Sequence, residues 1–245
     1  MKKILVLNYE FPPLGGGAAN ATYYLLKEFS SYSDLQIDLV TSSVDTFKRE
    51  KFAKNITIHY LDIKKNGNFH YQSMKDLLRY SFLAYKYCKK LKAETQFDLV
   101  HAFFGIPCGY IAMKLGLPYI VSLRGSDVPF YNTRFQFLDT LVFQRLSRKI
   151  WKNAKNVVAN SGGLKDLALQ TLSTQNIGLI YNGVDTDKFC PSNSKETSSV
   201  LRLVSTGRLI ERKGYQYLLE ALKNMDGVEL TLVGDGNLRM DLERK

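Results

Sequence analysis

Three consecutive glycines near the start of the chain are the first residues whose types suggest chemistry: Gly15, Gly16 and Gly17. They stand between an apolar segment and an amphipathic one, where backbone N–H groups at the start of a helix favour an anion. The dinucleotide fingerprint G-x-G-x-x-G fails, because Asn20 occupies its third glycine position. The acid expected at the end of the second strand is also missing, since Thr41 stands there. The loop therefore predicts an anion site of another kind, with a flexible turn that binds nothing as the alternative.

A second glycine-flanked loop, from Gly207 to Gly214, carries the basic residues Arg208 and Lys213. It too lies between a predicted strand and a predicted helix, at the edge of a sheet where ligands bind. Arg208 offers a planar fork that matches a phosphate group, and Lys213 offers a mobile point charge. Together they could neutralise a diphosphate that departs from a nucleotide. The alternative is that both are solvated charges on an exposed loop.

The histidines and cysteines give no sign of a metal site. His101 ends an apolar segment and is either a site-lining residue or a structural histidine, while His59 and His70 have no partner pattern. No cluster of His, Asp and Glu has ligand spacing, so no metal is expected. The three cysteines are widely spaced and form no C-x-x-C pair: Cys88, Cys108 and Cys190. This usage indicates a reducing compartment, with neither a disulfide framework nor a zinc site.

Short apolar segments alternate with longer amphipathic ones along the first 190 residues. Predicted strands cover 3–7, 36–41, 56–61, 98–101, 119–122, 156–159 and 177–181, and predicted helices cover 18–30, 73–93, 109–115, 134–152 and 164–172. Several strands are almost entirely apolar, which is typical of a parallel sheet with helices on both faces. The predicted fold class is therefore α/β, with a doubly wound parallel sheet.

A change of composition divides the chain. Residues 1–190 form the predicted first domain, and the polar segment that begins at Pro191 predicts a linker over 191–200. The alternation restarts with strands over 201–205 and 228–233 and a helix over 214–225, after which Gly234 opens another helix. One such βαβ unit cannot bury a core of its own. We therefore expect residues 201–245 to be the beginning of a second domain, incomplete within this sequence.

The chain has 245 residues and a formal net charge of +11, almost all of it carried by residues 1–200. Such an excess favours phosphorylated small molecules, nucleic acid or an anionic lipid surface. Five basic residues fall on one helix face of the segment 134–156, beside Trp151 and other apolar side chains: Arg145, Arg148, Lys149, Lys152 and Lys155. That segment is either an interfacial helix on anionic lipid or the solvated face of an ordinary helix. No signal peptide or membrane span is predicted, so we expect a cytoplasmic protein that is at most peripheral at the inner face of the cell membrane.

Four segments resemble glycosyltransferase family 4, whose members are retaining sugar transferases of the GT-B fold. They are residues 12–17 (PPLGGG), 124–128 (RGSDV), 181–189 (YNGVDTDKF), and 207–214 (GRLIERKG) with 233–236 (VGDG). The resemblance covers the whole chain in the family's order. It implies two Rossmann-like domains, with the acceptor held mainly by the first and a nucleotide sugar by the second, and it implies no cofactor and no catalytic metal.

The resemblance also implies roles for individual residues. Arg208 and Lys213 would bind the donor diphosphate, the glycine loop would approach the donor, and Asn182 and Gly234 would lie in the cleft. His101 is a further cleft candidate from its place at a strand end, with the structural alternative given above. The family often has His-Gly-x-Asp where this chain has Arg124 to Asp127, with that His near the transferred sugar. Arg124 cannot act as a base, so its expected role is electrostatic, holding a phosphate or an acidic sugar.

Two further expectations follow from the resemblance. Asp127 would contact an acceptor hydroxyl, with a helix N-cap or a salt bridge as the alternatives. The family's pair of Glu residues, separated by seven positions, is expected well after Lys245, so this chain alone would lack a large part of its donor site and could be inactive.

The expected function is transfer of a sugar from a nucleoside diphosphate sugar to a hydroxyl acceptor, either a glycan or a lipid-linked molecule, with retention. The expected setting is the assembly of a cell-surface polysaccharide, a lipopolysaccharide or a glycolipid, without a nucleic acid partner. Two alternatives stay open. One is a non-catalytic acceptor-binding fragment, and the other is an NAD(P)-dependent Rossmann oxidoreductase, which the missing third glycine disfavours.

Overall fold

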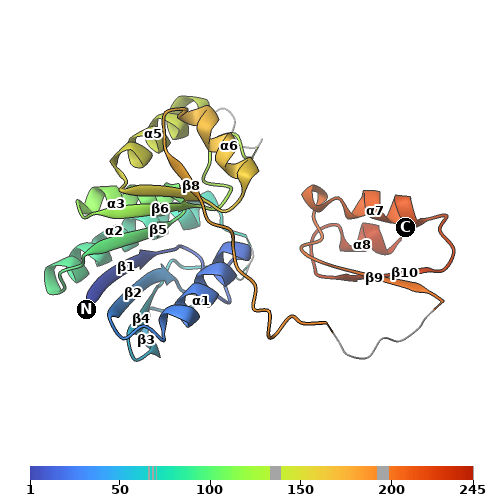
Figure 1. The fold of residues 1–245 in the computed structure, drawn as a ribbon, viewed down its shortest axis with the longest axis horizontal. Coiled ribbons are helices and arrows are strands. Elements are labelled where there is room, and N and C mark those ends of the chain that lie inside the picture. Colours follow the sequence, from blue (N-terminus) through green and yellow to red (C-terminus); the bar gives the residue numbers. More distant parts are fainter. Residues whose placement is uncertain (66, 68, 70, 133–138, 192–198, 245) are drawn as a thin grey trace. The chain divides into compact units, whose positions relative to one another are not determined.

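The computed structural model of the chain describes residues 1–65, 67, 69, 71–132, 139–191 and 199–244 (Figure 1). The chain divides into two compact units, Met1–Val184 and Asp185–Lys245, which are called unit 1 and unit 2 below. The linker expected over 191–200 falls mostly on residues 192–198, which lie outside the described residues. Each unit is described by itself.

Unit 1 is built on an eight-stranded sheet with the strand order β3-β4-β2-β1-β5-β6-β7-β8. The strands are β1 (Lys2–Leu7), β2 (Leu35–Ser42), β3 (Lys48–Ala53), β4 (Ile56–Leu61), β5 (Leu99–Phe103), β6 (Tyr119–Leu123), β7 (Asn156–Ala159) and β8 (Ile177–Leu179). All but β3 run parallel, and in their register Val6 of β1 lies between Leu39 of β2 and His101 of β5. The predicted α/β class is confirmed.

The strand β3 corrects the prediction of a wholly parallel sheet. It pairs antiparallel with β4 at the edge of the sheet, with Lys48 opposite Tyr60. Its sequence, KREKFA, has neither an apolar run nor a strict alternation, so the pattern did not predict a strand. An edge strand tolerates such a sequence, because its charged side chains stay in water and discourage pairing with another chain. At the opposite edge, β8 ends at Leu179, two residues earlier than predicted.

Helices cover both faces of this sheet. Helix α1 (Gly17–Phe29) connects β1 to β2, while α2 (Met74–Glu94), α3 (Tyr110–Leu115), α5 (Gln144–Asn153) and α6 (Gly162–Thr171) connect strands that advance in the other direction. Right-handed crossovers therefore place α1 on one face and the other four helices on the opposite face. Contacts between α2 and α3, α3 and α5, and α5 and α6 agree with that layer.

The helix predicted over 134–152 is described from Asp139 onward. Residues 134–138 lie outside the described residues, Asp139–Phe143 form a π-helical turn (η3), and the α-helix begins at Gln144.

Helix α2 begins at a capping box, in which Ser73 Oγ accepts a hydrogen bond from Asp76 N and Asp76 Oδ2 accepts one from Ser73 N. Among the described residues, no helix combines the length and the apolar composition needed to cross a bilayer.

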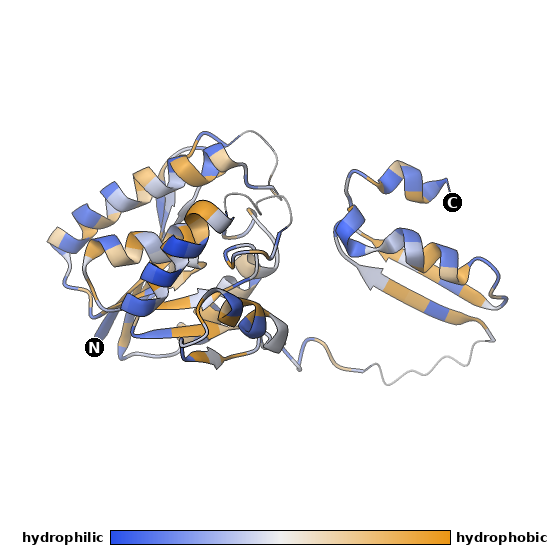
Figure 2. Cartoon of the chain, turned by 90° about the horizontal axis from the view of Figure 1, so that it is seen from above, coloured by the Kyte–Doolittle hydropathy of each residue, from blue (hydrophilic) through white to orange (hydrophobic). Residues whose placement is uncertain are grey.

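The core of unit 1 lies between the sheet and these helices, and Figure 2 shows both hydrophilic and hydrophobic residues along the helices that cover it. Leu5, Leu7 and Val121 have no exposed surface, as expected for strands covered on both faces. Trp151, the single tryptophan of the chain, is also fully buried. In the alternative of a lipid-facing helix Trp151 would be an apolar partner, and the structure excludes this because the ring is already inside the core.

Unit 2 contains a parallel pair of strands, β9 (Leu201–Thr206) and β10 (Val228–Val233). Between them lie a 3-10 turn, η4 (Glu211–Lys213), and helix α7 (Tyr215–Leu222), and α8 (Arg239–Glu243) follows β10. The predicted helix over 214–225 therefore ends three residues earlier, and the helix predicted to open at Gly234 begins at Arg239. The buried hydrophobic cluster of the described residues is small: Leu209, Tyr215 and Leu242.

Candidate functional site

The candidate residues of unit 1 gather at one edge of its sheet. The strands β1, β5 and β6 are neighbours and run parallel, so their carboxyl ends meet at the same edge. The loops that follow them carry the glycines, the turn Gly105–Gly109 (η1) and the turn from Arg124 to Asp127. This is the edge at which open α/β sheets bind ligands.

Asp127 holds two of these loops together. Its carboxylate is buried, and Oδ2 accepts a hydrogen bond from Gly105 N at 2.6 Å, while Oδ1 accepts bonds from Arg124 N at 2.9 Å and Gly125 N at 3.0 Å. Burial raises the pKa of this carboxyl group, and the backbone N–H groups oppose the shift. Because both oxygens already accept backbone hydrogen bonds, this geometry supports a positioning role. Contact with an acceptor hydroxyl stays a prediction.

Arg124 lies beside this anchor with part of its hydrogen-bonding capacity unused. Its guanidinium carbon is 4.6 Å from the centroid of the Phe103 ring, and Nη1 donates a hydrogen bond to Asn182 Oδ1 at 2.7 Å. Its Nε is buried without a hydrogen-bond partner among the described residues. Burial lowers the pKa of Arg124, and the Asp127 carboxylate opposes that shift. The structure therefore brings Arg124 and Asn182 together and leaves a desolvated cation that can hold an oxyanion.

His101 belongs to the same cluster. The sequence predicted that it ends its strand, but β5 continues to Phe103. It lies inside β5, with Nε2 at 2.8 Å from Ser122 Oγ, and its ring stacks on Phe103 with 4.5 Å between centroids. Burial and, secondly, the Arg124 charge lower the pKa of His101 to about 3. The imidazole is therefore neutral at neutral pH, and Ser122 and Phe103 hold its ring in place.

We expect His101 to make unit 1 less stable in acid. Between its ordinary pKa of 6.5 and the folded value of about 3, the unfolded chain binds a proton that the folded chain does not. Relative to a His101→Gln variant, the free energy of unfolding should fall by about 1.4 kcal/mol per pH unit below 6.5. Denaturant titrations on both sides of pH 6.5, followed by the fluorescence of Trp151, measure this difference. The same pH dependence in both proteins would contradict it.

The three glycines have different surroundings. Gly15 has φ +91° and its N–H donates a hydrogen bond to Phe69 O at 2.8 Å, and a Cβ at this position would overlap the Glu10 side chain. Gly16 precedes α1 and Gly17 is its first residue, and open space surrounds both. Gly15 is therefore required by the fold of the loop, while Gly16 and Gly17 leave room for an anion at the start of α1.

Two residues that the sequence did not single out connect this loop to its surroundings. Asn8 is fully buried, where Nδ2 donates to Thr22 Oγ1 at 2.8 Å and Oδ1 accepts a bond from Glu10 N at 3.1 Å. The Tyr9 hydroxyl is hydrogen-bonded to Ser126, and burial, followed by the charges of Glu10 and Asp127, raises its pKa. Tyr9 thus joins the glycine loop to the turn that carries Arg124. In the sequence, Asn8 and Tyr9 could have been identified as a pair of polar residues directly after an apolar strand.

In unit 2, Arg208 and Lys213 lie at the carboxyl end of β9, and both are exposed. Lys213 belongs to the turn η4, and its Cε lies 3.9 Å from the position of a Cβ built on Gly207. The Lys213 side chain therefore folds back towards the residue that precedes Arg208. The structure brings the two cations to one edge of the small sheet, and their binding of a diphosphate stays a prediction.

Gly234 has a packing reason to be glycine. A Cβ at Gly234 would overlap the carbonyl oxygen of Gly207, and one at Gly236 would overlap that of Leu209. Hydrogen bonds from Gly207 N to Val233 O at 3.0 Å and from Leu209 N to Asp235 O at 2.8 Å hold the two segments together. The loop after β10 thus supports the loop that carries Arg208, and direct contact of Gly234 with a ligand stays a prediction.

The groups that could hold a metal are absent from the described part of the chain, where no three residues among His, Cys, Asp and Glu come together. Cys88 and Cys108 are buried, and burial raises the pKa of both thiols, while Cys190 is exposed.

Comparison with known proteins gives a family. Residues 15–188 match the family described as Glycosyltransferase Family 4. No curated protein matches the sequence.

Solved structures share the fold at low identity. Sucrose-phosphate synthase from Thermosynechococcus elongatus is 16% identical with a TM-score of 0.74, and the match covers 100% of this chain and 66% of that one. A structure named trehalose-6-phosphate from E. coli, bound with UDP-2-fluoro glucose, is 13% identical with a TM-score of 0.66, over 99% of this chain and 68% of that one. S. aureus TarM, in complex with Fondaparinux, α-GlcNAc-glycerol and UDP, is 12% identical with a TM-score of 0.62, over 100% of this chain and 74% of that one.

These likenesses establish the fold. The expected α/β fold of GT-B type is confirmed, and the chain spans about two thirds of the length of the first two structures.

Proposed function

Because the chain belongs to glycosyltransferase family 4, we propose that it transfers a sugar from a nucleoside diphosphate sugar to a hydroxyl acceptor. The match of residues 15–188 to that family carries the proposal. Two similar structures support the donor class, since one is named as bound with UDP-2-fluoro glucose and another as a complex with UDP. The second name also includes Fondaparinux and α-GlcNAc-glycerol, which supports an acceptor of glycan or related hydroxyl type.

In the proposed reaction the bond between the anomeric carbon and the diphosphate oxygen breaks, and a bond from the acceptor oxygen to that carbon forms. Arg208 and Lys213 of unit 2 neutralise the charge that develops on the departing diphosphate. The acceptor attacks on the face from which the diphosphate leaves, so the leaving phosphate takes the acceptor proton and the configuration is retained. No side chain is needed as a base, which is consistent with Arg124 standing where the family often has His.

The residues of unit 1 have supporting roles in this proposal. Arg124 holds a phosphate or an acidic sugar through the outer part of its guanidinium, where Nη1 meets the exposed Asn182. Asp127 positions the turn that carries Arg124. If an Arg124→Gln variant binds an acidic acceptor as tightly as the unchanged protein, this role of Arg124 is wrong.

The acceptor class and the cellular setting are narrower parts of the proposal. The basic excess of the chain favours an acidic or lipid-linked acceptor, in the assembly of a cell-surface polysaccharide, a lipopolysaccharide or a glycolipid. We place this work in the cytoplasm, at the inner face of the membrane.

A transfer assay tests the function. The chain is incubated with UDP-, GDP- and ADP-sugars and a glycan acceptor, and the products are followed by proton NMR of the anomeric signals. We expect one nucleoside diphosphate to be released in step with a glycoside of the donor's own anomeric configuration. EDTA should leave the rate unchanged, since the two basic side chains supply the positive charge. Oxidation or reduction of NAD(P) without sugar transfer would indicate the oxidoreductase instead, and glycan binding without donor binding would indicate an acceptor-binding fragment.

A further inference from the structure

The positive charge of this protein is concentrated on one layer of helices. Helices α2, α3 and α5 together contain eleven Lys and Arg residues but two acidic residues, Asp76 and Glu94. This difference of nine accounts for most of the formal net charge of +11. All eleven basic residues are exposed: Lys75, Arg79, Lys86, Lys89, Lys90, Lys92, Lys114, Arg145, Arg148, Lys149 and Lys152. Neighbouring helices in this layer contact each other, so the charges form one surface, called the basic layer below.

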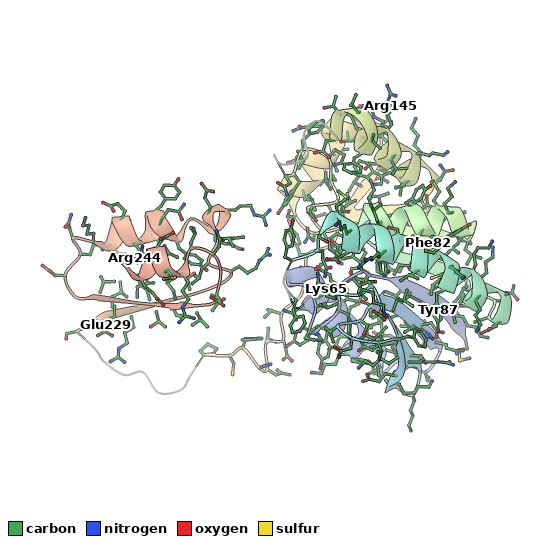
Figure 3. The ribbon with its side chains drawn as sticks, turned by 180° about the vertical axis from the view of Figure 1, so that it is seen from behind. Lys65, Phe82, Tyr87, Arg145, Glu229 and Arg244 are labelled. Atoms are coloured by element: carbon green, nitrogen blue, oxygen red, sulfur yellow. The ribbon has the colours of Figure 1, made fainter. Side chains whose placement is uncertain are left out.

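Large apolar side chains stand in the middle of the basic layer. On α2, Leu78 is 64% exposed and Phe82 is 68% exposed, and Met74 lies one turn before them. At 100° per residue, Phe82 points away from the sheet, opposite the buried residues Tyr80 and Cys88. A second exposed pair, Leu141 and Val142, precedes α5, and Figure 3 labels Phe82 on α2 and Arg145 on α5. An outward position in the middle of a helix face normally carries a polar residue, so the fold does not explain Leu78 and Phe82.

A hollow in the same layer has cationic walls. It has a volume of about 390 Å³ and lies between the last turns of α2 and α3, with Tyr85, Lys89, Lys92, Lys114 and Leu115 among its lining residues. The Lys92 ammonium donates a hydrogen bond to Leu115 O at 2.7 Å, at the end of α3. Because α3 follows β5 and runs back across the sheet, this hollow lies at the end of the layer opposite the carboxyl ends of the strands. It is therefore separate from the candidate site.

We propose that the basic layer docks the protein on a bilayer that contains anionic lipids, with Leu78 and Phe82 inserted among the headgroups. The basic side chains complement the negative surface, and the apolar side chains between them bury surface that a purely electrostatic contact would leave in water. Nucleic acid would also complement the charge, but exposed Leu and Phe at the centre of the layer do not serve a phosphate backbone. The alternative of lipid contact by the segment 134–156 is thereby extended to α2, which supplies exposed apolar side chains in place of the buried Trp151.

The orientation of α2 connects this surface to the candidate site. Helix α2 follows β4, so its first residue, Met74, lies at the carboxyl edge of the sheet, where the loops of Gly15–Gly17 and Arg124 also lie. Docking through α2 would hold that edge near the membrane, where a lipid-linked acceptor is found. This connection rests on the proposed function, whereas the docking itself does not.

Vesicle co-sedimentation of the full chain tests the docking. The protein is mixed with vesicles of phosphatidylcholine alone, or of equal parts phosphatidylcholine and phosphatidylglycerol, and the bound fraction is measured after centrifugation. We expect binding to the anionic vesicles that is at least tenfold stronger than binding to the neutral ones, with a decrease at high salt. Absence of binding to the anionic vesicles would overturn the proposal.

Paired variants separate this surface from the general charge of the protein. Leu78→Ser with Phe82→Ser, and Lys86→Glu with Lys89→Glu, should each weaken vesicle binding at least tenfold. Lys51→Glu with Lys54→Glu, on exposed residues at β3, reverses as many charges outside the layer, and Val204→Ser replaces an apolar residue of unit 2 that is 71% exposed. Both controls should retain most of the binding. If the controls lose as much as the layer variants, or if the serine pair binds like the unchanged protein, the proposal is wrong.

Further measurements cover the competing explanations. Trp151 fluorescence checks that unit 1 is folded in each variant of that unit, and circular dichroism checks the Val204→Ser variant of unit 2. Tighter binding of the chain to single- or double-stranded DNA than to anionic vesicles, or a dimer in light scattering that the serine pair abolishes, would replace the membrane by another occupant. Nucleoside diphosphate binding should be the same in the layer variants and in the unchanged protein, so failure of the docking and failure of the proposed function can be told apart.

Discussion

Replacing Arg208 by alanine is expected to weaken the binding of a nucleoside diphosphate by about tenfold to a hundredfold. The loss corresponds to one charge-assisted contact, about 1.5–3 kcal/mol. Arg208 and Lys213 stand at the carboxyl end of β9, and Lys213 folds back beside Gly207. Two cations at the same end of one strand can contact both phosphates of one diphosphate. Calorimetric titration of the full chain with the nucleoside diphosphate that binds best measures the effect.

Three further variants define that result. Lys213→Ala should weaken binding by a similar factor, and the double variant should remove measurable binding. Arg202→Ala is the matched control, because Arg202 is an exposed arginine on β9 whose Nε lies 3.6 Å from Glu229 Oε2. An exposed ion pair of this kind contributes little, so the control should bind like the unchanged protein. Unchanged affinity in Arg208→Ala, or equal losses in Arg208→Ala and Arg202→Ala, would remove Arg208 from the donor site.

The second large effect is expected at Asp127. In Asp127→Ala, three backbone N–H groups of buried loops lose their acceptor: those of Gly105, Arg124 and Gly125. A buried donor left without a partner costs about 1–3 kcal/mol, so unit 1 should lose at least about 3 kcal/mol of its free energy of unfolding. Denaturant titration followed by Trp151 fluorescence measures the loss, because Trp151 is buried in unit 1.

Asp127→Asn and Asp185→Ala complete this experiment. The amide of Asn keeps one oxygen acceptor, so Asp127→Asn should lose less stability than Asp127→Ala. Asp185, the first residue of unit 2, accepts a hydrogen bond from Lys188 N at Oδ1, and its replacement should leave the free energy of unfolding of unit 1 unchanged. The positioning role of Asp127 predicts that donor binding by unit 2 survives in all three variants. An Asp127→Ala protein with unchanged stability but no transfer activity would instead place Asp127 in the catalytic step.

The sequence predicted the parallel part of the sheet well, because those strands are covered on both faces and read as apolar runs. The strand β3 was missed for the opposite reason, since its residues Lys48 to Lys51 are solvated at the edge of the sheet. The prediction of one continuous helix over 134–152 missed the π-helical turn at Asp139–Phe143. Periodicity alone does not show where such a turn ends and an α-helix begins. The same limit applies to Trp151, whose position within an amphipathic pattern fitted lipid contact although the core takes it.

The candidate site was predicted in part. Glycines and cations at strand-to-helix turns mark a ligand edge from sequence alone, and the structure brings Arg124, Asn182 and His101 together there. The connections between loops could not be read from the chain, because they join residues far apart in sequence. Asp127 contacts Gly105, and Tyr9 contacts Ser126. The glycine at Gly234 was assigned to the cleft by resemblance, and its packing against Gly207 appears only in three dimensions.

The most direct test of the proposed function is calorimetric titration of the full chain with UDP, GDP, ADP and NAD. We predict that one nucleoside diphosphate binds, that NAD does not, and that Arg208→Ala loses this binding while Arg202→Ala keeps it. Binding of NAD alone, without any nucleoside diphosphate, would contradict the assignment of this chain as a nucleotide-sugar-dependent transferase.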